Sequence, residues 1–278
     1  MAESSATPSA DASGAPAAPI ELIDSHCHVE MLDHPDGALT AAATAGVGTV
    51  VSVGIDLATS RRAVALAERR AGGAWPKVAA TVGLHPHAAA RLDDPLLAEL
   101  EELAGRPGVV AIGECGLDFY RDLSPRDAQR RAFVAQIDLA RRVGLPLVVH
   151  TREAGDETME LLARHADGLT VVMHCFSLPE HVEECDARGY YASFAGNLTY
   201  KNAGGLRAAA ARLHEDLLMV ETDAPFLSPV PYRGEPNSPA RVALTAAALA
   251  EVRGTSLAHV AAVTTANARR AFRLSAAT

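Results

Sequence analysis

The sequence has few aromatic residues and no apolar run that is long enough to cross a membrane. Only 4% of its 278 residues are Phe, Trp or Tyr. No stretch of about 18 or more consecutive apolar residues occurs. The start of the chain also lacks the basic segment and apolar stretch of a secretory signal. These absences predict a cytoplasmic protein without a membrane span.

Cysteine is scarce, and none of the four cysteines forms a CxxC pair; they are Cys27, Cys115, Cys175 and Cys185. We expect reduced thiols in the cytosol. The first three each follow a candidate metal ligand, and strand neighbours point to opposite faces. Their side chains should therefore face the surrounding helices as small buried groups.

A broad positive surface is also missing, since the formal net charge is −9. This charge argues against extensive binding of duplex nucleic acid. It does not exclude an enzyme that holds a few phosphates with metal ions and local cations. No Gly-rich phosphate loop is visible, which disfavours an open, doubly wound sheet.

Residues 1–19 are almost all Ala, Ser, Pro, Gly and Asp, so we expect a disordered tail. Residues 20–278 have the size of one barrel domain. Eight β-rich runs are predicted as strands: 20–24, 47–53, 78–82, 109–113, 145–149, 170–173, 190–194 and 217–221. Helical patterns lie between them, for example at 125–143, and two more helices are predicted at 240–252 and 257–272. Alternating strands and helices predict an α/β fold, a (β/α)8 TIM-type barrel with extra C-terminal helices.

Six residues able to ligate a metal follow or end predicted strands: His26, His28, Glu114, His150, His174 and Asp223. The C-terminal strand ends of such a barrel meet at one mouth. Each residue alone has an ordinary explanation, such as a buried core histidine or, for Asp223, a helix cap. Together they predict a site for two divalent ions (Mg²⁺, Mn²⁺ or Zn²⁺), with Glu114 able to bridge them.

Several motifs resemble the TatD family of metal-dependent deoxyribonucleases, in the amidohydrolase superfamily. They are IDSHCHVE, GLHPH, GECGLDFY, VVHTRE, MHCFS and VETDAPFLSPVPYRGEPNSP, with VTTANARRAF near the end. The resemblance extends from residue 20 to about residue 273. It implies a distorted TIM barrel, the same six metal ligands, and hydrolysis of DNA phosphodiesters, often as a 3′ to 5′ exonuclease on single strands. Many other amidohydrolases bridge their metals with a carboxylated lysine, where this chain has Glu114.

We therefore predict cleavage of DNA by a metal-activated hydroxide, with Glu114 and Asp223 as catalytic residues and Asp223 as general base. No obligate protein partner is evident. Polar residues in the predicted mouth loops are candidates for substrate contacts: His85, His87, Arg121, Arg152, Asn197, Lys201, Tyr232 and Arg233. Three aromatic residues could stack on bases: Phe119, Tyr120 and Phe176.

Two alternatives stay open from the sequence. The same metal site could hydrolyse another ester or amide, such as a lactone or a D-aminoacyl-tRNA, because fold and metal site do not determine the substrate. A non-catalytic metal-binding scaffold is the alternative of another class. The complete ligand set argues against the scaffold, as does a carboxylate placed to accept a proton.

Overall fold

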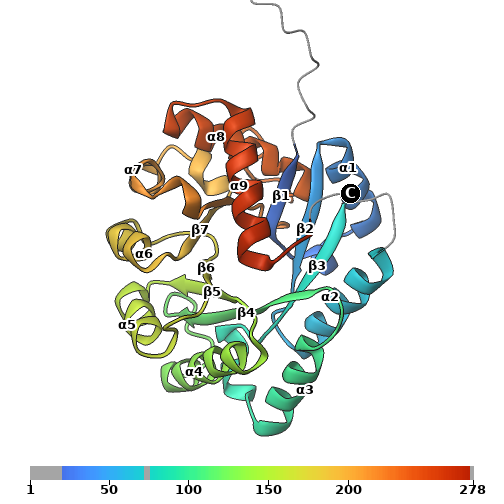
Figure 1. Cartoon of the computed structure of the whole chain (residues 1–278), viewed down its shortest axis with the longest axis vertical. Helices are drawn as coiled ribbons and strands as arrows, with labels where there is room; N and C mark the ends of the chain where they lie inside the picture. The colour runs from blue at the N-terminus through green and yellow to red at the C-terminus, as the bar shows by residue number, and fades with distance from the viewer. Residues whose placement is uncertain (1–20, 72–75, 276–278) are drawn as a thin grey trace, which may run out of the picture.

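Eight parallel strands in sequence order form the centre of the molecule (Figure 1). The computed structural model describes residues 21–71 and 76–275. The strands are β1 (Leu22–Cys27), β2 (Val47–Val53), β3 (Lys77–Val82), β4 (Val109–Asp118), β5 (Leu147–Arg152), β6 (Val171–Met173), β7 (Tyr191–Phe194) and β8 (Leu218–Val220). The predicted (β/α)8 barrel is confirmed, since each strand pairs in parallel with the next.

Helices follow the strands and cover the outside of the sheet (Figure 1). They are α1 (Pro35–Thr44), α2 (Leu57–Arg70), α3 (Asp94–Ala104), α4 (Arg126–Val143), α5 (Gly155–His165), α6 (Val182–Arg188), α7 (Gly204–Arg212), α8 (Val242–Arg253) and α9 (Leu257–Phe272). The longest, α4, ends where Gly144 adopts a left-handed conformation with φ 70°. Glycine enters this region at little cost, which explains the sharp stop.

Side-chain and backbone hydrogen bonds connect β8 to β1 and complete the ring. The Ser25 hydroxyl donates to the carbonyl of Val220 at 3.0 Å. The buried Asp24 carboxylate accepts the Thr222 backbone N–H at 2.8 Å. Just beyond the strand β8, the Asp223 N–H donates to the carbonyl of His26 at 2.9 Å. The first and last strands are thereby held together at the end of the barrel where the candidate ligands lie.

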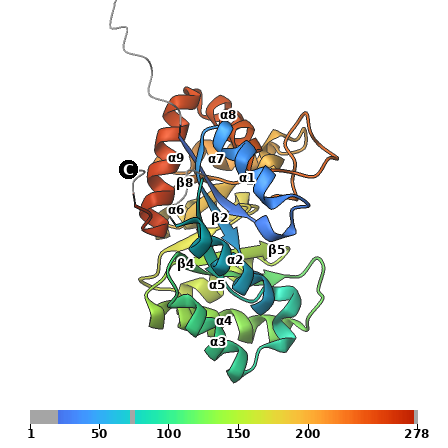
Figure 2. The ribbon, with the colours of Figure 1, turned by 90° about the vertical axis from the view of Figure 1, so that its right-hand side faces the viewer.

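The barrel interior is filled by one apolar residue from each strand. The eight are Ile23, Val51, Ala79, Ala111, Val148, Val172, Tyr191 and Met219, all buried. Ala268, Ala271 and Phe272 of α9 pack against this layer. Figure 2 places α9 at one end of the barrel and the long loops after β4 and β8 at the other. In the described part of the chain the interior is therefore a packed core whose floor is closed by α9, and the mouth lies at the opposite end.

Two strands are bulged where candidate ligands occur. Between Ile112 and Cys115, β4 advances three residues while β5 advances two. Between Asp24 and Cys27, β1 advances three residues while β2 advances two. A bulge redirects a side chain and bends its strand. These irregularities give the barrel the distortion that the resemblance implied.

The thiols of Cys27 and Cys115 are fully buried in the core between sheet and helices, as predicted. Cys175 differs, because β6 ends at Met173 and the chain turns at Cys175 with φ 43°. The described helices include none that is long and apolar enough to span a bilayer. The predicted tail at residues 1–19 lies outside the described residues.

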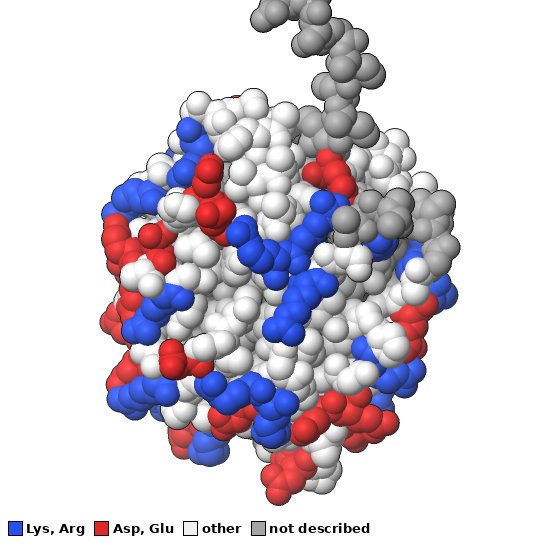
Figure 3. Space-filling model, in the orientation of Figure 1, with Lys and Arg blue, Asp and Glu red and all other residues white. Residues whose placement is uncertain are grey.

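Charges of both signs are interspersed on the face that carries α9 (Figure 3). Binding that is driven by the release of counterions from many phosphates needs a broad basic surface. The face that carries α9 is not broadly basic, in keeping with the net charge of −9. Contacts to a substrate are therefore expected at the mouth.

Candidate metal centre

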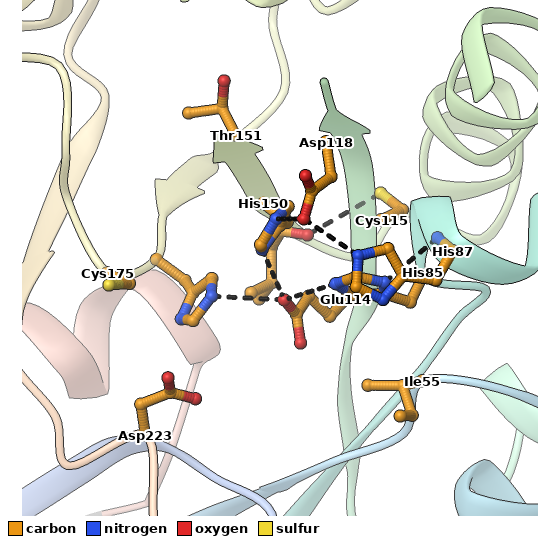
Figure 4. A network of polar contacts seen from close by, with 12 residues as sticks. Ile55, His85, His87, Glu114, Cys115, Asp118, His150, Thr151, Cys175 and Asp223 are labelled. Atoms are coloured by element: carbon orange, nitrogen blue, oxygen red, sulfur yellow. Dashed lines mark hydrogen bonds and ion pairs between the residues drawn. The ribbon is translucent and has the colours of Figure 1, made fainter. Parts of the chain in front are cut away.

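Glu114 lies at the centre of the six predicted ligands, and its two carboxylate oxygens face different histidines. Figure 4 shows one of these oxygens in contact with His85 and His150. Oε1 lies 2.9 Å from His150 Nδ1 and 3.2 Å from His174 Nε2. Oε2 lies 3.4 Å from His26 Nε2 and 3.7 Å from His28 Nε2. A carboxylate in this position can bridge two cations, one on each side.

The β4 bulge and the neighbouring backbone hold Glu114 in this position. Its N–H donates to the carbonyl of Gly54 at 3.0 Å, beyond the end of β2. Two residues on, Gly116 has φ 138°, and a Cβ there would lie 2.0 Å from the carbonyl oxygen of His150. The missing side chain therefore lets β4 and β5 approach closely enough for Glu114 to meet His150.

Asp223 completes the cluster from the β8 side. Its Oδ1 lies 3.3 Å from His28 Nε2 and 3.8 Å from His26 Nε2. The backbone turns at Asp223 with φ 55°, a conformation that Asp tolerates better than most residues. Its side chain is 12% exposed, whereas that of Glu114 is 3% exposed. Asp223 therefore combines a place beside the ligands with access to water in the mouth.

The structure brings a seventh residue, His85, into the same cluster. His85 Nε2 lies 3.4 Å from Glu114 Oε1. Its Nδ1 accepts the N–H of His87 at 3.2 Å, which leaves Nε2 facing Glu114. Donor atoms of His85, Glu114 and His150 lie within 4.8 Å of one another. The same holds for His26, His28 and Glu114, and for His26, His174 and Asp223. His85 was expected in a substrate-binding loop, and its geometry is that of a ligand or ligand neighbour.

Buried polar atoms without hydrogen bonds fit a metal ion in this cluster. Within the described parts of the chain, both ring nitrogens of His26, Nδ1 of His28 and Oε2 of Glu114 have no hydrogen-bond partner. Leaving such atoms unsatisfied is costly. A mixed set of imidazole and carboxylate donors satisfies the preferences of Zn²⁺ or Mn²⁺. The residues present therefore fit divalent cations.

The pKa values of these groups reflect how closely opposite charges are packed. Burial favours neutral His28, but Asp223 and Glu114 outweigh it and raise the pKa of His28 to about 9. Burial would also raise the pKa of Glu114, but the facing histidines hold that pKa well below its usual value. For His85, burial dominates and lowers the pKa to about 4. The carboxylates are thus ionised and ready to ligate a cation.

Two further carboxylates orient the histidines, and the sequence reading had not singled them out. Glu221 Oε1 lies 3.0 Å from His174 Nδ1, so Nε2 of His174 points to the cluster. Asp118 Oδ2 lies 3.3 Å from His150 Nε2 and 2.9 Å from His87 Nε2. Hydrogen bonding of this kind is typical around metal-ligating histidines. Asp118 could have been found from the sequence, because it lies four residues after Glu114 on β4 and such residues point to the same face of a strand.

Of the remaining substrate candidates, Arg152 ends β5 and the others lie in segments beyond the strand ends, where several contact neighbouring side chains. The Arg152 guanidinium lies 3.9 Å from the centre of the Tyr120 ring. The Arg233 guanidinium lies 4.4 Å from the Tyr200 ring, and that of Arg241 lies 3.9 Å from the Tyr232 ring. Three other substrate candidates also contact neighbouring residues. Asn197 Nδ2 lies 3.9 Å from the Cys175 sulfur. The Lys201 carbonyl accepts a hydrogen bond from Arg207, and the Arg121 N–H donates one to Asp118.

The aromatic residues proposed for base stacking differ in their exposure. Tyr120 is 54% exposed. Phe176 is 2% exposed and packs against Phe194 in the core, so its assignment as a stacking face is wrong. Phe119 is partly buried against the core beneath Arg126. Of the three, Tyr120 alone presents its ring to the solvent.

Comparison with known proteins identifies the family. The profile of the TatD related DNase family matches residues 23–273. An uncharacterized metal-dependent hydrolase, TatD of Mycobacterium tuberculosis, is 38% identical over 265 residues, covering 91% of this chain and 98% of that protein. A 3′-5′ ssDNA/RNA exonuclease, TatD of Shigella flexneri, is 36% identical over 244 residues, covering 85% of this chain and 92% of that protein. The crystal structure of YjjV, a TatD homologue from Escherichia coli K12, superposes with a TM-score of 0.85 at 30% identity, covering 93% of this chain and all of that one. The family expected from the motifs is confirmed, and the chain belongs to the TatD-related DNases, which are metal-dependent hydrolases.

Proposed function

We propose that this protein is a 3′ to 5′ exonuclease that removes nucleotides from single-stranded DNA with the help of two divalent ions. The observation that carries the proposal is the bridging position of Glu114, whose two oxygens face two sets of histidines. A relative that is 36% identical is named as a 3′-5′ ssDNA/RNA exonuclease, which supports the substrate class and the polarity. RNA is therefore a second substrate to test.

In this proposal the ligands divide around Glu114. One ion would be held by His26, His28 and Asp223, which lie close together. The other would be held by His150 and His174, with His85 close to it, on the Oε1 side of Glu114. Bound divalent ions lower the pKa of an attacking water and offset charge on the phosphate oxygens. Mg²⁺, Mn²⁺ and Zn²⁺ are the candidates to compare.

The protein's own groups would orient the substrate and move the proton. Asp223, whose side chain is 12% exposed and lies beside His28, would accept the proton of the attacking water. Arg152, at the end of β5, and Arg233, in the loop after β8, would contact the phosphates that flank the scissile bond. His87, Arg121, Asn197, Lys201 and Tyr232 are further contact candidates in these loops. Two oriented carboxylates and nearby cations thus provide acid–base chemistry and charge stabilisation in one place.

Two further properties belong to the proposal. The four cysteines are free, which suits a reducing cytoplasm. We also propose that residues 20–278 form one catalytic domain that needs no protein partner. One extended core joins helices α1 to α9 to the sheet, in keeping with a single unit.

The test uses metal-free protein reloaded separately with Mg²⁺, Mn²⁺ or Zn²⁺. Single-stranded and duplex DNA and single-stranded RNA, each labelled at the 3′ or the 5′ end, are incubated with wild type and with Glu114→Ala. We expect metal-dependent shortening from the 3′ end, which is lost in the variant. Absence of cleavage by metal-loaded wild-type protein would overturn the nuclease proposal and favour another ester or amide substrate.

A further inference from the structure

Large apolar side chains that are exposed to solvent gather around the mouth. Among the described residues, six stand out in this way: Met31, Tyr120, Leu123, Phe226, Val230 and Tyr232. All six lie in segments that follow β1, β4 or β8, at the end of the barrel opposite α9. Exposed apolar groups that cluster in one region mark a surface for binding. Their position around the metal centre indicates that the bound molecule is the substrate.

Phe226 is held firmly although its ring is 52% exposed. Its N–H donates to the carbonyl of Asp223 at 2.8 Å, and its own carbonyl accepts from Asn237 Nδ2 at 2.8 Å. The ring meets His28 edge to face, with 5.9 Å between centroids. A rigid backbone therefore presents an aromatic face directly beside two candidate ligands.

Tyr120 occupies a matching position on the β4 side. Its N–H donates to Asp118 Oδ1 at 3.0 Å, and the other oxygen of this carboxylate faces His150. The Arg152 guanidinium lies over the Tyr120 ring, which nevertheless stays 54% exposed. A stacked guanidinium orders the ring and leaves the rest of its surface for a second planar group.

The loops that carry the two rings lie on opposite sides of the metal centre. In the ring of eight strands, β4 and β8 are four strands apart. Figure 2 shows the loops that follow them projecting separately from the mouth. The chain of contacts between the rings runs from Phe226 through His28 and Glu114 to His150 and Asp118. A strand bound with its phosphate at the centre would have a base near each ring.

We propose that Phe226 and Tyr120 form a stacking clamp that binds the unpaired bases on the two sides of the scissile phosphate. The inference rests on the proposed function and specifies its substrate class. In a duplex, neighbouring bases already occupy the faces that the clamp needs, so a strand must be unpaired to enter. Every base has a π-face, so the clamp tolerates any sequence while it selects single strands. Stacking on the clamp gives affinity for the strand although this acidic protein has no broad basic surface to bind phosphates.

The experiment measures cleavage of two 5′-labelled single strands by the metal-loaded protein. One strand carries normal bases, and the other has abasic residues at its last two positions. The variants Phe226→Ala and Tyr120→Ala remove one ring each, and Phe226→Tyr and Tyr120→Phe keep the π-face. Asp122→Asn and Glu235→Gln, in the same two loops, change charged side chains that pair with Arg126 and Arg241 and lie outside the clamp. A parallel binding assay follows fluorescence quenching of 2-aminopurine at the 3′ end.

We expect each Ala variant to raise KM for the normal strand by roughly 5- to 100-fold, with little change in kcat, because one stacking contact is lost. Wild type and Ala variants should cleave the abasic strand alike, and quenching should weaken only when a ring is removed. The aromatic exchanges and the two controls should behave like wild type. The clamp would be overturned if wild type and Ala variants had equal KM values on the normal strand. It would also be overturned if the Ala variants raised KM equally on the normal and the abasic strand. If wild type cleaves neither strand, the proposed function fails, while the quenching assay still decides for or against stacking.

Discussion

Asp118 reaches across from β4 to β5 and places its Oδ2 atom 3.3 Å from Nε2 of His150, on the side of the ring away from Glu114. The imidazole is thereby held between two carboxylates, because its Nδ1 lies 2.9 Å from Glu114. The direction of the ring is therefore set before any cation arrives.

The first prediction concerns this orientation. Asp118→Asn should weaken binding of the ion beside His150 by about 10- to 100-fold, which is typical when such a hydrogen bond to a ligating histidine is changed. Metal titrations of activity and calorimetric binding would measure the shift. Activity should recover at high metal concentration, because Asp118 positions a ligand without ligating. Asp122→Asn, four residues later in the loop after β4 and paired with Arg126, is the matched control. Unchanged metal affinity in Asp118→Asn would contradict the positioning role.

The second prediction concerns metal removal. Chelation should abolish activity and lower the melting temperature, and added Mn²⁺ or Zn²⁺ should restore both. A ligand at 100 times its dissociation constant stabilises a fold by about 2.7 kcal/mol. Glu114→Gln keeps the shape of the side chain but removes its charge, so its melting temperature should barely respond to metal. Glu251→Gln, exposed on α8, serves as control. A wild-type metal response in Glu114→Gln would show that Glu114 is not a ligand.

The third prediction concerns pH and the start of α2. Burial opposes ionisation of Asp56, but hydrogen bonds from the Thr59 N–H and hydroxyl hold its pKa below the ordinary value of 3.8. The charged cap therefore stabilises the fold above pH 4, and this contribution is lost as the pH falls through the lowered pKa. Asp56→Ala should cost about 0.5–2 kcal/mol at neutral pH, because a helix cap is removed.

Urea denaturation at several pH values would test this expectation. Asp56→Asn keeps a good capping group that does not titrate, so its stability should change less between pH 5 and pH 3 than that of the wild type. The difference in the free energy of unfolding between wild type and Asp56→Ala should become smaller from pH 5 to pH 3. If this difference did not depend on pH, the charge of Asp56 would not be what stabilises the start of α2.

The fourth prediction concerns the floor of the barrel. Phe272 is 2% exposed and packs with Ala268 and Ala271 against the interior layer. Phe272→Ala should reduce the free energy of unfolding by about 3–5 kcal/mol, as is usual for a buried aromatic side chain. Phe272→Leu fills more of the space and should cost less. Denaturant unfolding measures both, and equal stability of all three proteins would show that the floor does not depend on this side chain.

The sequence predicts the barrel well, and it picks out six candidate ligands that the structure brings together, because both follow from simple periodicity. Runs such as the one before His150 are continuously apolar, and their ends must meet at one edge. Strand limits were less accurate, since β4 continues to Asp118 and β5 to Arg152, five and three residues past the predicted ends. Past the apolar runs, β4 and β5 remain paired with each other up to Asp118 and Arg152. A pattern of hydrophobic residues does not detect this part of a strand.

Other features could not be read from a pattern. His85 turns toward Glu114 because Pro86 begins a short 3-10 turn and the His87 N–H holds the ring, a loop geometry with no periodic signal. Phe176 was expected at the mouth, but the turn at Cys175 carries it into the core. Phe226 was not singled out, since its exposure depends on how the loop after β8 folds over Asn237.

The helix α9 joins the two ends of the folded chain. The Thr265 hydroxyl donates to the carbonyl of Glu21, and Arg269 contacts both carboxylate oxygens of Glu21 at 2.7 Å. During synthesis α9 emerges after all eight strands, so the apolar floor of the barrel stays open to water until the ribosome has made nearly all of the described chain. A nascent chain halted before α9 would expose that floor to chaperones and proteases, and release of the last helix would then complete folding in a single late step.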